Sequence, residues 1–137
     1  MKTVAIIPAS GVGIRMDSEI RKQYMMLCGL PIIIHTLNVF QRTSKVDDIF
    51  LVLPEEDVDE AQQIIVRKYQ LSKIKRILPG GLYRQDSVKM GIDAVDSYYD
   101  IVVIHDGVRP FVSKELIEIA ISGAVETGAA VIGIPAK

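Results

Sequence analysis

Several features that would point to particular classes of protein are scarce or missing in this 137-residue sequence. Cys28 is the single cysteine, which excludes an internal disulfide and favours a reducing, cytoplasmic location; we interpret it as a packing residue. Tryptophan is absent, and aromatic residues make up only 6%, too few for platforms that stack nucleic-acid bases. The net charge of −1 gives no basic field, and the apolar runs are far shorter than the ~20 residues of a membrane span. We therefore expect small-molecule partners, with neither nucleic acid nor membrane.

The length and the composition predict one globular domain over residues 1–137. A chain of this size can bury roughly two-thirds of its unfolded surface, which is enough for one hydrophobic core. Apolar residues make up 49% and charged residues 24%, so the balance is that of an ordinary soluble domain.

Short apolar segments rich in β-branched residues alternate with helical patterns along the whole chain. We expect strands at residues 4–8, 48–54, 73–79, 100–106 and 129–135, and helices at residues 31–40, 55–70, 84–95 and 113–125. The third strand alternates apolar and polar residues, which favours an edge position. In the third helix, Val88, Ile92 and Val95 are expected to form the packed face, and Ser113 is expected to cap the fourth helix. This order predicts an α/β fold of the Rossmann-like, doubly wound type with a mainly parallel sheet.

Three unusual segments are predicted to meet at the carboxyl edge of this sheet. They are P-A-S-G-V-G-I-R-M at residues 8–16, P-G-G-L-Y-R-Q-D-S at residues 79–87 and H-D-G-V-R-P at residues 105–110. Ligands of doubly wound folds bind at that edge, outside the ends of the strands. The connection after the first strand is also much longer than the about 2–6 residues that are usual, which favours a functional loop.

The first segment has glycines at Gly11 and Gly13 that allow the backbone to approach a phosphate closely. A dinucleotide-binding loop would continue to a third glycine, but Met16 stands there and the second strand lacks a closing acid. An oxidoreductase of that type is therefore disfavoured. Arg15 and Lys22, in the same long loop, suggest a clamp for a triphosphate; the alternative is a structural turn with solvated charges.

The other two segments offer a helix N-terminus and a carboxylate. Gly81 precedes a helix whose first turn holds Ser87. The free N–H groups at the start of this helix either bind an anion or belong to an ordinary capped turn. Asp106 ends the fourth strand, and one such carboxylate is enough for Mg²⁺ that also takes substrate phosphates. Arg109 either contacts a substrate or forms an ion pair that ties the loops together. His105 either braces the loop or acts as a general base.

Quoted together with K-Q-Y and G-L-P-I-I-I-H-T, these segments resemble the 2-C-methyl-D-erythritol 4-phosphate cytidylyltransferase family. The ribitol-5-phosphate cytidylyltransferases share most of the pattern. The resemblance implies an enzyme of isoprenoid precursor biosynthesis that joins CTP to a sugar-alcohol phosphate with Mg²⁺ and releases pyrophosphate. It also implies catalytic roles for Arg15 and Lys22, Mg²⁺ binding by Asp106, and a place beside the second substrate for Gly107 and Arg109. The CTP contacts implied by position are Pro8, Ala9, Ser10, Gly11, Gly13, Arg15, Lys22, Gly81, Arg84 and Ser87.

The sequence departs from the family in a few places. Ser10 replaces a small apolar residue or glycine, so its hydroxyl either adds a contact or fills space, and Leu82 stands where an acid is frequent. Members of the family are longer, so we expect this chain to be the N-terminal part of the domain, without the dimerisation arm and the C-terminal portion. The full-length family is expected to form homodimers. For this chain, a CTP-binding fragment without turnover remains the alternative to an enzyme.

Overall fold

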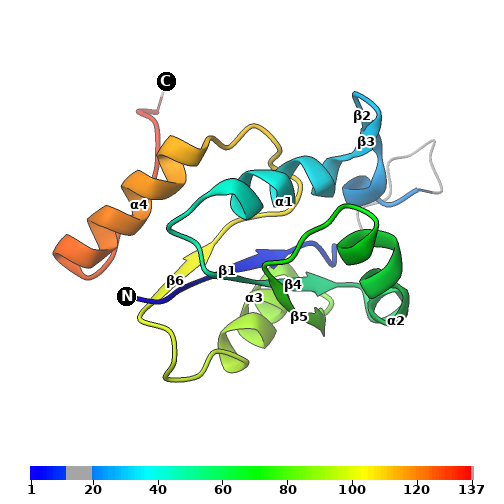
Figure 1. Cartoon of the computed structure of the whole chain (residues 1–137), viewed down its shortest axis with the longest axis horizontal. Coiled ribbons are helices and arrows are strands. Elements are labelled where there is room, and N and C mark those ends of the chain that lie inside the picture. The colour runs from blue at the N-terminus through cyan, green and yellow to red at the C-terminus, as the bar shows by residue number, and fades with distance from the viewer. Residues whose placement is uncertain (12–19, 137) are drawn as a thin grey trace.

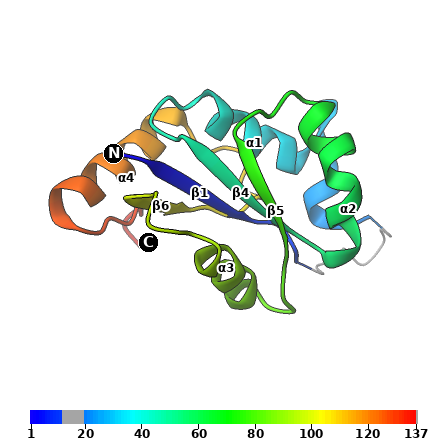
Figure 2. The same ribbon diagram turned by 60° about the horizontal axis from the view of Figure 1, so that its bottom comes forward.

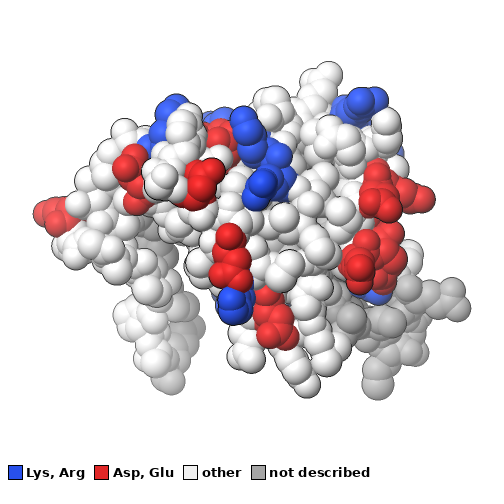
Figure 3. Space-filling model, turned by 90° about the horizontal axis from the view of Figure 1, so that it is seen from below, with Lys and Arg blue, Asp and Glu red and all other residues white. Residues whose placement is uncertain are grey.

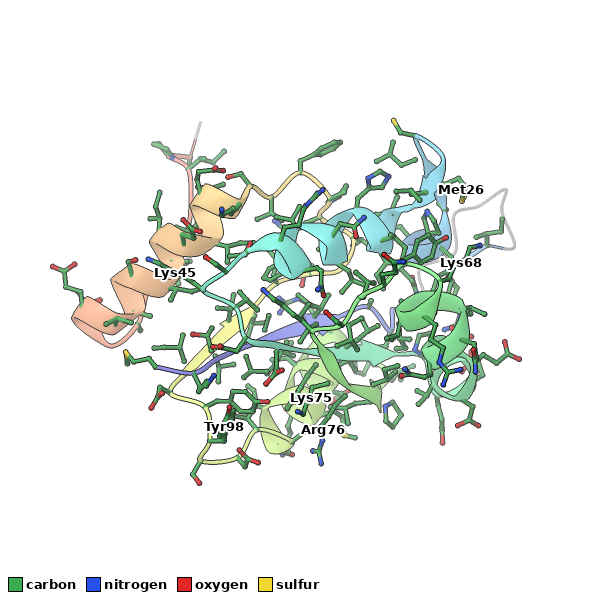
Figure 4. The ribbon with its side chains drawn as sticks, in the orientation of Figure 1. Met26, Lys45, Lys68, Lys75, Arg76 and Tyr98 are labelled. Atoms are coloured by element: carbon green, nitrogen blue, oxygen red, sulfur yellow. The ribbon has the colours of Figure 1, made fainter. Side chains whose placement is uncertain are left out.

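The computed structural model describes residues 1–11 and 20–136, which build a four-stranded parallel sheet with helices on both faces (Figure 1). The order across the sheet is β5-β4-β1-β6. The strands are β1 (Thr3–Pro8), β4 (Asp48–Leu53), β5 (Ile74–Pro79) and β6 (Ile101–Ile104). This arrangement confirms the predicted Rossmann-like, doubly wound class, and β5 lies at an edge as expected. Figure 4 shows Lys75 and Arg76 on that edge strand, where charged side chains oppose pairing with another chain.

The side chains of the central strands alternate between two hydrophobic clusters, one on each face of the sheet. Ala5 and Ile7 pack with α1 (Ile32–Arg42), with α2 (Val58–Ala61) and with α4 (Lys114–Thr127). On the other face, Val4 and Ile6 lie in the cluster beside α3 (Arg84–Asp93), as Figure 2 shows. Strand β1 is therefore buried on both faces, which is why it has no polar residue between Thr3 and its end.

The helices follow local sequence signals closely. Ser113 caps α4, because its Oγ accepts a hydrogen bond from the backbone N–H of Leu116 at 3.2 Å, as predicted. The expected helix over residues 55–70 is divided into a 3₁₀ turn η2 (Glu55–Asp57), α2 and a π-helical segment η3 (Gln62–Arg67). A helical segment thus exists there, but with three different backbone geometries.

A small antiparallel hairpin lies in the long connection after β1. It joins β2 (Met26–Leu27) to β3 (Leu30–Pro31), and Cys28 and Gly29 form its two-residue turn with φ angles of 50° and 81°. Two central residues with positive φ are the requirement of a tight hairpin turn. The interpretation of Cys28 as a packing residue is therefore wrong, since its side chain is exposed. Met26, labelled beside this hairpin in Figure 4, is 66% exposed.

The expected fifth strand at residues 129–135 is absent, which corrects the sequence prediction. This described segment has no regular secondary structure, and Val131 is 94% exposed. A strand exists through hydrogen bonds to a neighbouring strand, and apolar composition alone does not supply a neighbour. Strand β6 consequently lies at the edge of the described sheet, with Val102 and Ile104 exposed.

The packed face of α3 agrees with the prediction only in part: Val95, just after the helix, packs against the cluster of Val4 and Ile6 as expected. Ile92 is 46% exposed, whereas the residues that are buried on α3 are Ser87 and Gly91. A Cβ atom added to Gly91 would lie only 2.4 Å from Cγ2 of Ile6. The helix therefore approaches β1 through its smallest residues, and a large apolar side chain on this face would keep the two elements apart.

We expect Gly91→Ala to destabilise the fold by about 1–2 kcal/mol, although alanine is normally preferred to glycine in a helix by about 1 kcal/mol. The added methyl group overlaps a branched side chain of β1 that is fully buried. Urea unfolding measures the effect. Gly123→Ala in α4 is the matched control, because its Cβ would meet only Ala130 at 3.0 Å, in an exposed segment that can yield. Equal stabilisation by both substitutions would contradict the close approach.

The face in Figure 3 carries both acidic and basic side chains, and several acidic ones gather towards its right-hand edge. Within the described ranges, every helix is too short or too polar to cross a bilayer.

Candidate functional site

A cavity of about 220 Å³ opens at the carboxyl edge of the sheet, where the three unusual segments meet. All three segments contribute to its walls, so their predicted convergence is confirmed. The lining residues are Pro8, Ala9, Ser10, Gly11, Lys22, Gln23, Gly81, Leu82, Tyr83, Arg84, Ser87, Asp106 and Val108. A larger hollow of about 360 Å³ lies between Met1 and α4, but it contains none of the residues that the sequence singled out.

Backbone hydrogen bonds to neighbouring strands hold the first residues of these loops at the edge of the sheet, beside the cavity. The N–H of Ala9 donates to the carbonyl of Val52 at 2.8 Å, and the N–H of Gly107 donates to the carbonyl of Pro8 at 3.0 Å. The backbone after β1 is thus held from both sides. Side chains that follow directly, such as Ser10, are placed by a rigid sheet rather than by a free loop.

Ser10, Gly80 and Ser87 interlock behind the cavity. Ser10 and Ser87 are only 7% and 1% exposed, and their hydroxyl groups share a hydrogen bond although 77 residues separate them in the sequence. Gly80 lies against this pair, because a Cβ atom at that position would be 2.1 Å from Oγ of Ser10. The Ser10 hydroxyl therefore does more than fill space: it connects the loop after β1 to helix α3.

Lys22 is the first residue of a short 3₁₀ helix, η1 (Lys22–Tyr24). The side chains of the other two residues of η1 anchor it by hydrogen bonds. Gln23 is buried, and its Nε2 donates to the carbonyl of Gly11 at 3.4 Å. The hydroxyl of Tyr24 donates to a carboxylate oxygen of Asp57 at 2.5 Å. Burial and this carboxylate raise the pKa of Tyr24 above its usual value, so the hydroxyl remains a donor. The exposed Lys22 side chain is thus carried to the cavity on an anchored backbone.

Asp106 is bound by two arginines from different directions. Nε of Arg84, at the start of α3, lies 2.7 Å from Oδ1 of Asp106. Nε of Arg109, in the same loop as the carboxylate, lies 3.2 Å from Oδ2. We call these three residues the Asp106 cluster. The ion pair of Arg109 lies within one loop, and it is Arg84 that ties the loop of Asp106 to α3.

The donor set of the Asp106 cluster is compatible with Mg²⁺. Among residues 1–11 and 20–136, three or more His, Cys, Asp or Glu side chains nowhere come together as a metal site. Mg²⁺ keeps several waters and requires only one or two protein carboxylates when phosphates supply further oxygens. One carboxylate at the cavity wall therefore fits Mg²⁺ that is shared with a phosphate ligand.

His105 lies outside the cavity wall. Its ring lies against that of Phe40 at a centroid distance of 5.3 Å and a tilt of 52°, in the core on the α1 side. Nδ1 is buried and has no hydrogen-bond partner in the described part of the chain. Burial lowers the pKa of His105 below its usual value, so the ring stays neutral at pH 7. This geometry favours a bracing role over that of a general base.

Most of the predicted site residues surround the cavity, but Gly107 and Arg109 are described residues that do not line it. Gly107 is buried behind the wall, and its carbonyl accepts a hydrogen bond from Oγ1 of Thr36 at 2.8 Å. Arg109 reaches the site through Asp106. Gly13 and Arg15 lie outside the described residues.

The sequence prediction missed four residues of the cavity wall. Three of them neighbour predicted residues in the chain and could have been included on that ground: Leu82, Tyr83 and Val108. Gln23 is different, because a glutamine beside a charged lysine gives no sign that its side chain will be buried.

Comparisons with known proteins agree with this geometry in fold and in sequence. The structure of CMP:2-keto-3-deoxy-manno-octonic acid synthetase complexed with CTP covers 94% of this chain and 49% of its own, with a TM-score of 0.70 and 19% identity. The structure of 4-diphosphocytidyl-2C-methyl-D-erythritol synthase from Anaerococcus prevotii covers 89% of this chain and 50% of its own, with a TM-score of 0.73 and 32% identity. The chain therefore has the α/β fold class of these nucleotidyltransferases.

The sequence comparison is more specific. The family described as IspD, 2-C-methyl-D-erythritol 4-phosphate cytidylyltransferase, matches residues 3–137, and the chain belongs to this family. The 2-C-methyl-D-erythritol 4-phosphate cytidylyltransferase of Geobacter metallireducens is 41% identical over 140 aligned residues, which cover 100% of this chain. The chain spans 60% of the length of that relative.

Proposed function

We propose that this chain forms the nucleotide-binding part of a cytidylyltransferase, which transfers CMP from CTP to 2-C-methyl-D-erythritol 4-phosphate and releases pyrophosphate. The observation that supports this proposal most is the lining of one cavity in a member of this family: residues of the loop after β1, Lys22, Arg84 and Asp106 all lie there. The combination offers backbone N–H groups and cationic side chains to a polyphosphate.

The proposed reaction needs alignment and charge neutralisation rather than a protein nucleophile. An oxygen of the second substrate's phosphate attacks the α-phosphorus of CTP, a new P–O bond forms, and the bond to the leaving pyrophosphate breaks. In this proposal, Ala9 to Gly11, Gly81 and Ser87 hold the nucleotide, and Lys22, with Arg15, neutralises charge on the α-phosphate. Asp106 would hold Mg²⁺, whose contribution when bound is to neutralise triphosphate charge. Arg109 would lie beside the second substrate.

A second candidate is a CTP-binding module without turnover. Such a module requires only the residues of the cavity that would hold the nucleotide. A homodimer and a cytoplasmic location stay predictions for this chain.

Two measurements test the proposal. Calorimetry with CTP and Mg²⁺ measures binding, and pyrophosphate release with CTP and 2-C-methyl-D-erythritol 4-phosphate measures turnover. Binding with release supports the enzyme, and binding without release supports the module. Release with ribitol 5-phosphate in place of the methylerythritol substrate would change the substrate assignment. Binding of NADH with none of CTP would overturn the cytidylyl interpretation.

Lys22→Ala is expected to lower turnover by about 100-fold and to weaken CTP binding much less, because the ammonium group would act mainly where charge develops in the transition state. Pyrophosphate release and CTP calorimetry on the same preparation give the two numbers. Lys75→Ala, an exposed lysine on β5 outside the cavity, is the control and should change neither. Equal losses of turnover and of affinity would mean that Lys22 serves ground-state binding only.

A further inference from the structure

The two oxygens of Asp106 are both in contact with arginine side chains. Oδ1 faces Nε of Arg84, and Oδ2 faces Nε of Arg109. Asp106 is also the only carboxylate among the described residues that line the cavity. A cation that arrives alone therefore meets one negative charge beside the positive charges of Arg84, Arg109 and Lys22, and both carboxylate oxygens are already paired.

The two arginines differ in their place relative to the cavity. Arg109 follows Asp106 by three residues, its side chain is 74% exposed, and it does not line the cavity, whereas Arg84 does. Arg84 comes from another element, and its side chain is 62% exposed while that of Asp106 is 21% exposed. An ion pair with such an exposed partner contributes little to stability, so its side chain can leave at low cost.

The backbone around Arg84 would not need to move for the Arg84 side chain to leave Asp106. Tyr83 is the N-cap of α3, and its N–H donates to the carboxylate of Asp86 at 3.1 Å. This capping box holds the helix start independently of the Arg84 side chain. The guanidinium can therefore turn from the carboxylate towards the cavity, which it also lines, while α3 stays in place.

We propose that Arg84 and a divalent cation exchange at Asp106 when a metal–nucleotide complex binds. Before binding, the Arg84 guanidinium occupies Oδ1. On binding, the cation takes Oδ1, and Arg84 transfers its contact to a phosphate oxygen, so that each negative group keeps a positive partner. The proposal rests on the proposed function. It makes Arg84 a positioning residue that disfavours metal without nucleotide and favours the two together.

The test is the affinity for Mn²⁺ in the absence of nucleotide, measured from the free-ion signal in electron paramagnetic resonance. Arg84→Ala is expected to bind Mn²⁺ roughly tenfold more tightly than the wild type, the ratio expected when a unit charge about 5 Å from a divalent ion is removed in a water-like dielectric. Adding Asp106→Asn to Arg84→Ala should abolish the gain, which assigns it to this carboxylate.

Lys89→Ala is the matched control, because Lys89 is a cation of the same helix that pairs with Asp93 and lies outside the cavity wall. It should bind Mn²⁺ as the wild type does. Arg84→Met, which keeps the apolar stem, repeats the test in case the alanine variant unfolds, and thermal melting reports folding. An unchanged Mn²⁺ affinity in a folded Arg84 variant overturns the exchange.

Failure of the exchange and failure of the proposed function give different results. If the wild type binds CTP with Mg²⁺ but the Arg84 variants do not change Mn²⁺ affinity, only the exchange is wrong. If the wild type does not bind CTP, the proposed function is wrong, and a tighter Mn²⁺ site in Arg84→Ala would then show only that Arg84 blocks Asp106.

Discussion

Asp106→Asn is expected to remove most of the increase in CTP affinity that Mg²⁺ provides, with binding at saturating Mg²⁺ weakened by at least about tenfold. The amide keeps the size of the side chain but supplies neither the charge nor the second oxygen that a hard cation prefers. Calorimetric titrations of CTP with Mg²⁺ and with a chelator give the metal-dependent part of the binding free energy for each protein.

A competing explanation of Asp106 predicts a different pattern. If the carboxylate only orients Arg84 and Arg109 for phosphate binding, the substitution should weaken CTP binding equally with and without Mg²⁺. Asp93→Asn on α3 is the control, since its partner is Lys89 and it lies outside the cavity wall. Wild-type metal dependence in Asp106→Asn would contradict the metal role.

Gly80→Ala is expected to lower the free energy of unfolding by about 3 kcal/mol and to weaken CTP binding as well, because it forces apart two walls of the cavity. The new Cβ atom would lie 2.1 Å from Oγ and 2.2 Å from Cβ of Ser10, and 2.8 Å from Oγ of Ser87. The Cβ of Ser10 cannot rotate away, because it is fixed to a backbone bonded on both sides of the sheet. Urea unfolding measures the stability and calorimetry the affinity.

The structure also provides a rescue for this substitution. Ser10→Gly removes both Ser10 atoms that the added methyl group would meet, and Oγ of Ser87 can turn aside. The double variant Gly80→Ala, Ser10→Gly should therefore be more stable than Gly80→Ala alone. Ser10→Gly by itself should cost about 1 kcal/mol, from the lost hydrogen bond to Ser87 and the added backbone freedom. A single Gly80→Ala variant as stable as the wild type would show that the three residues do not interlock.

Local patterns were sufficient for the parts of the fold that depend on nearby residues. The apolar, β-branched composition of β1 and β4 and the capping serine before α4 are properties of short segments, and both predictions are confirmed. Strand β5 lies at an edge as expected, although its burial does not alternate along the strand. The order of strands and helices then restricts the topology, because parallel strands joined by helices bring their carboxyl ends to one edge. Because of that rule, the sequence alone predicts that three loops distant in the chain meet in one cavity.

Features that depend on partners distant in the sequence could not be predicted in the same way. Residues 129–135 have a strand-like composition but find no neighbour in the described structure, whereas the two-residue strands of the β2–β3 hairpin are too short to leave a periodic signal. On α3, the apolar residues suggested one face, but Gly91 allows a closer approach on another. The face of α3 that packs on the sheet is therefore the one whose small residues allow the shorter distance to β1.

The sequence by itself determined the α/β class, the doubly wound order and the edge of the sheet at which the candidate residues gather, since each follows from local periodicity and chain connectivity. Only the tertiary structure decided which of those residues touch. The Ser10–Ser87 hydrogen bond and the two arginines on Asp106 join side chains from separate loops. Such contacts form or fail with changes of a few tenths of an ångström in the separation of two elements, and the order of residues along the chain does not specify that separation.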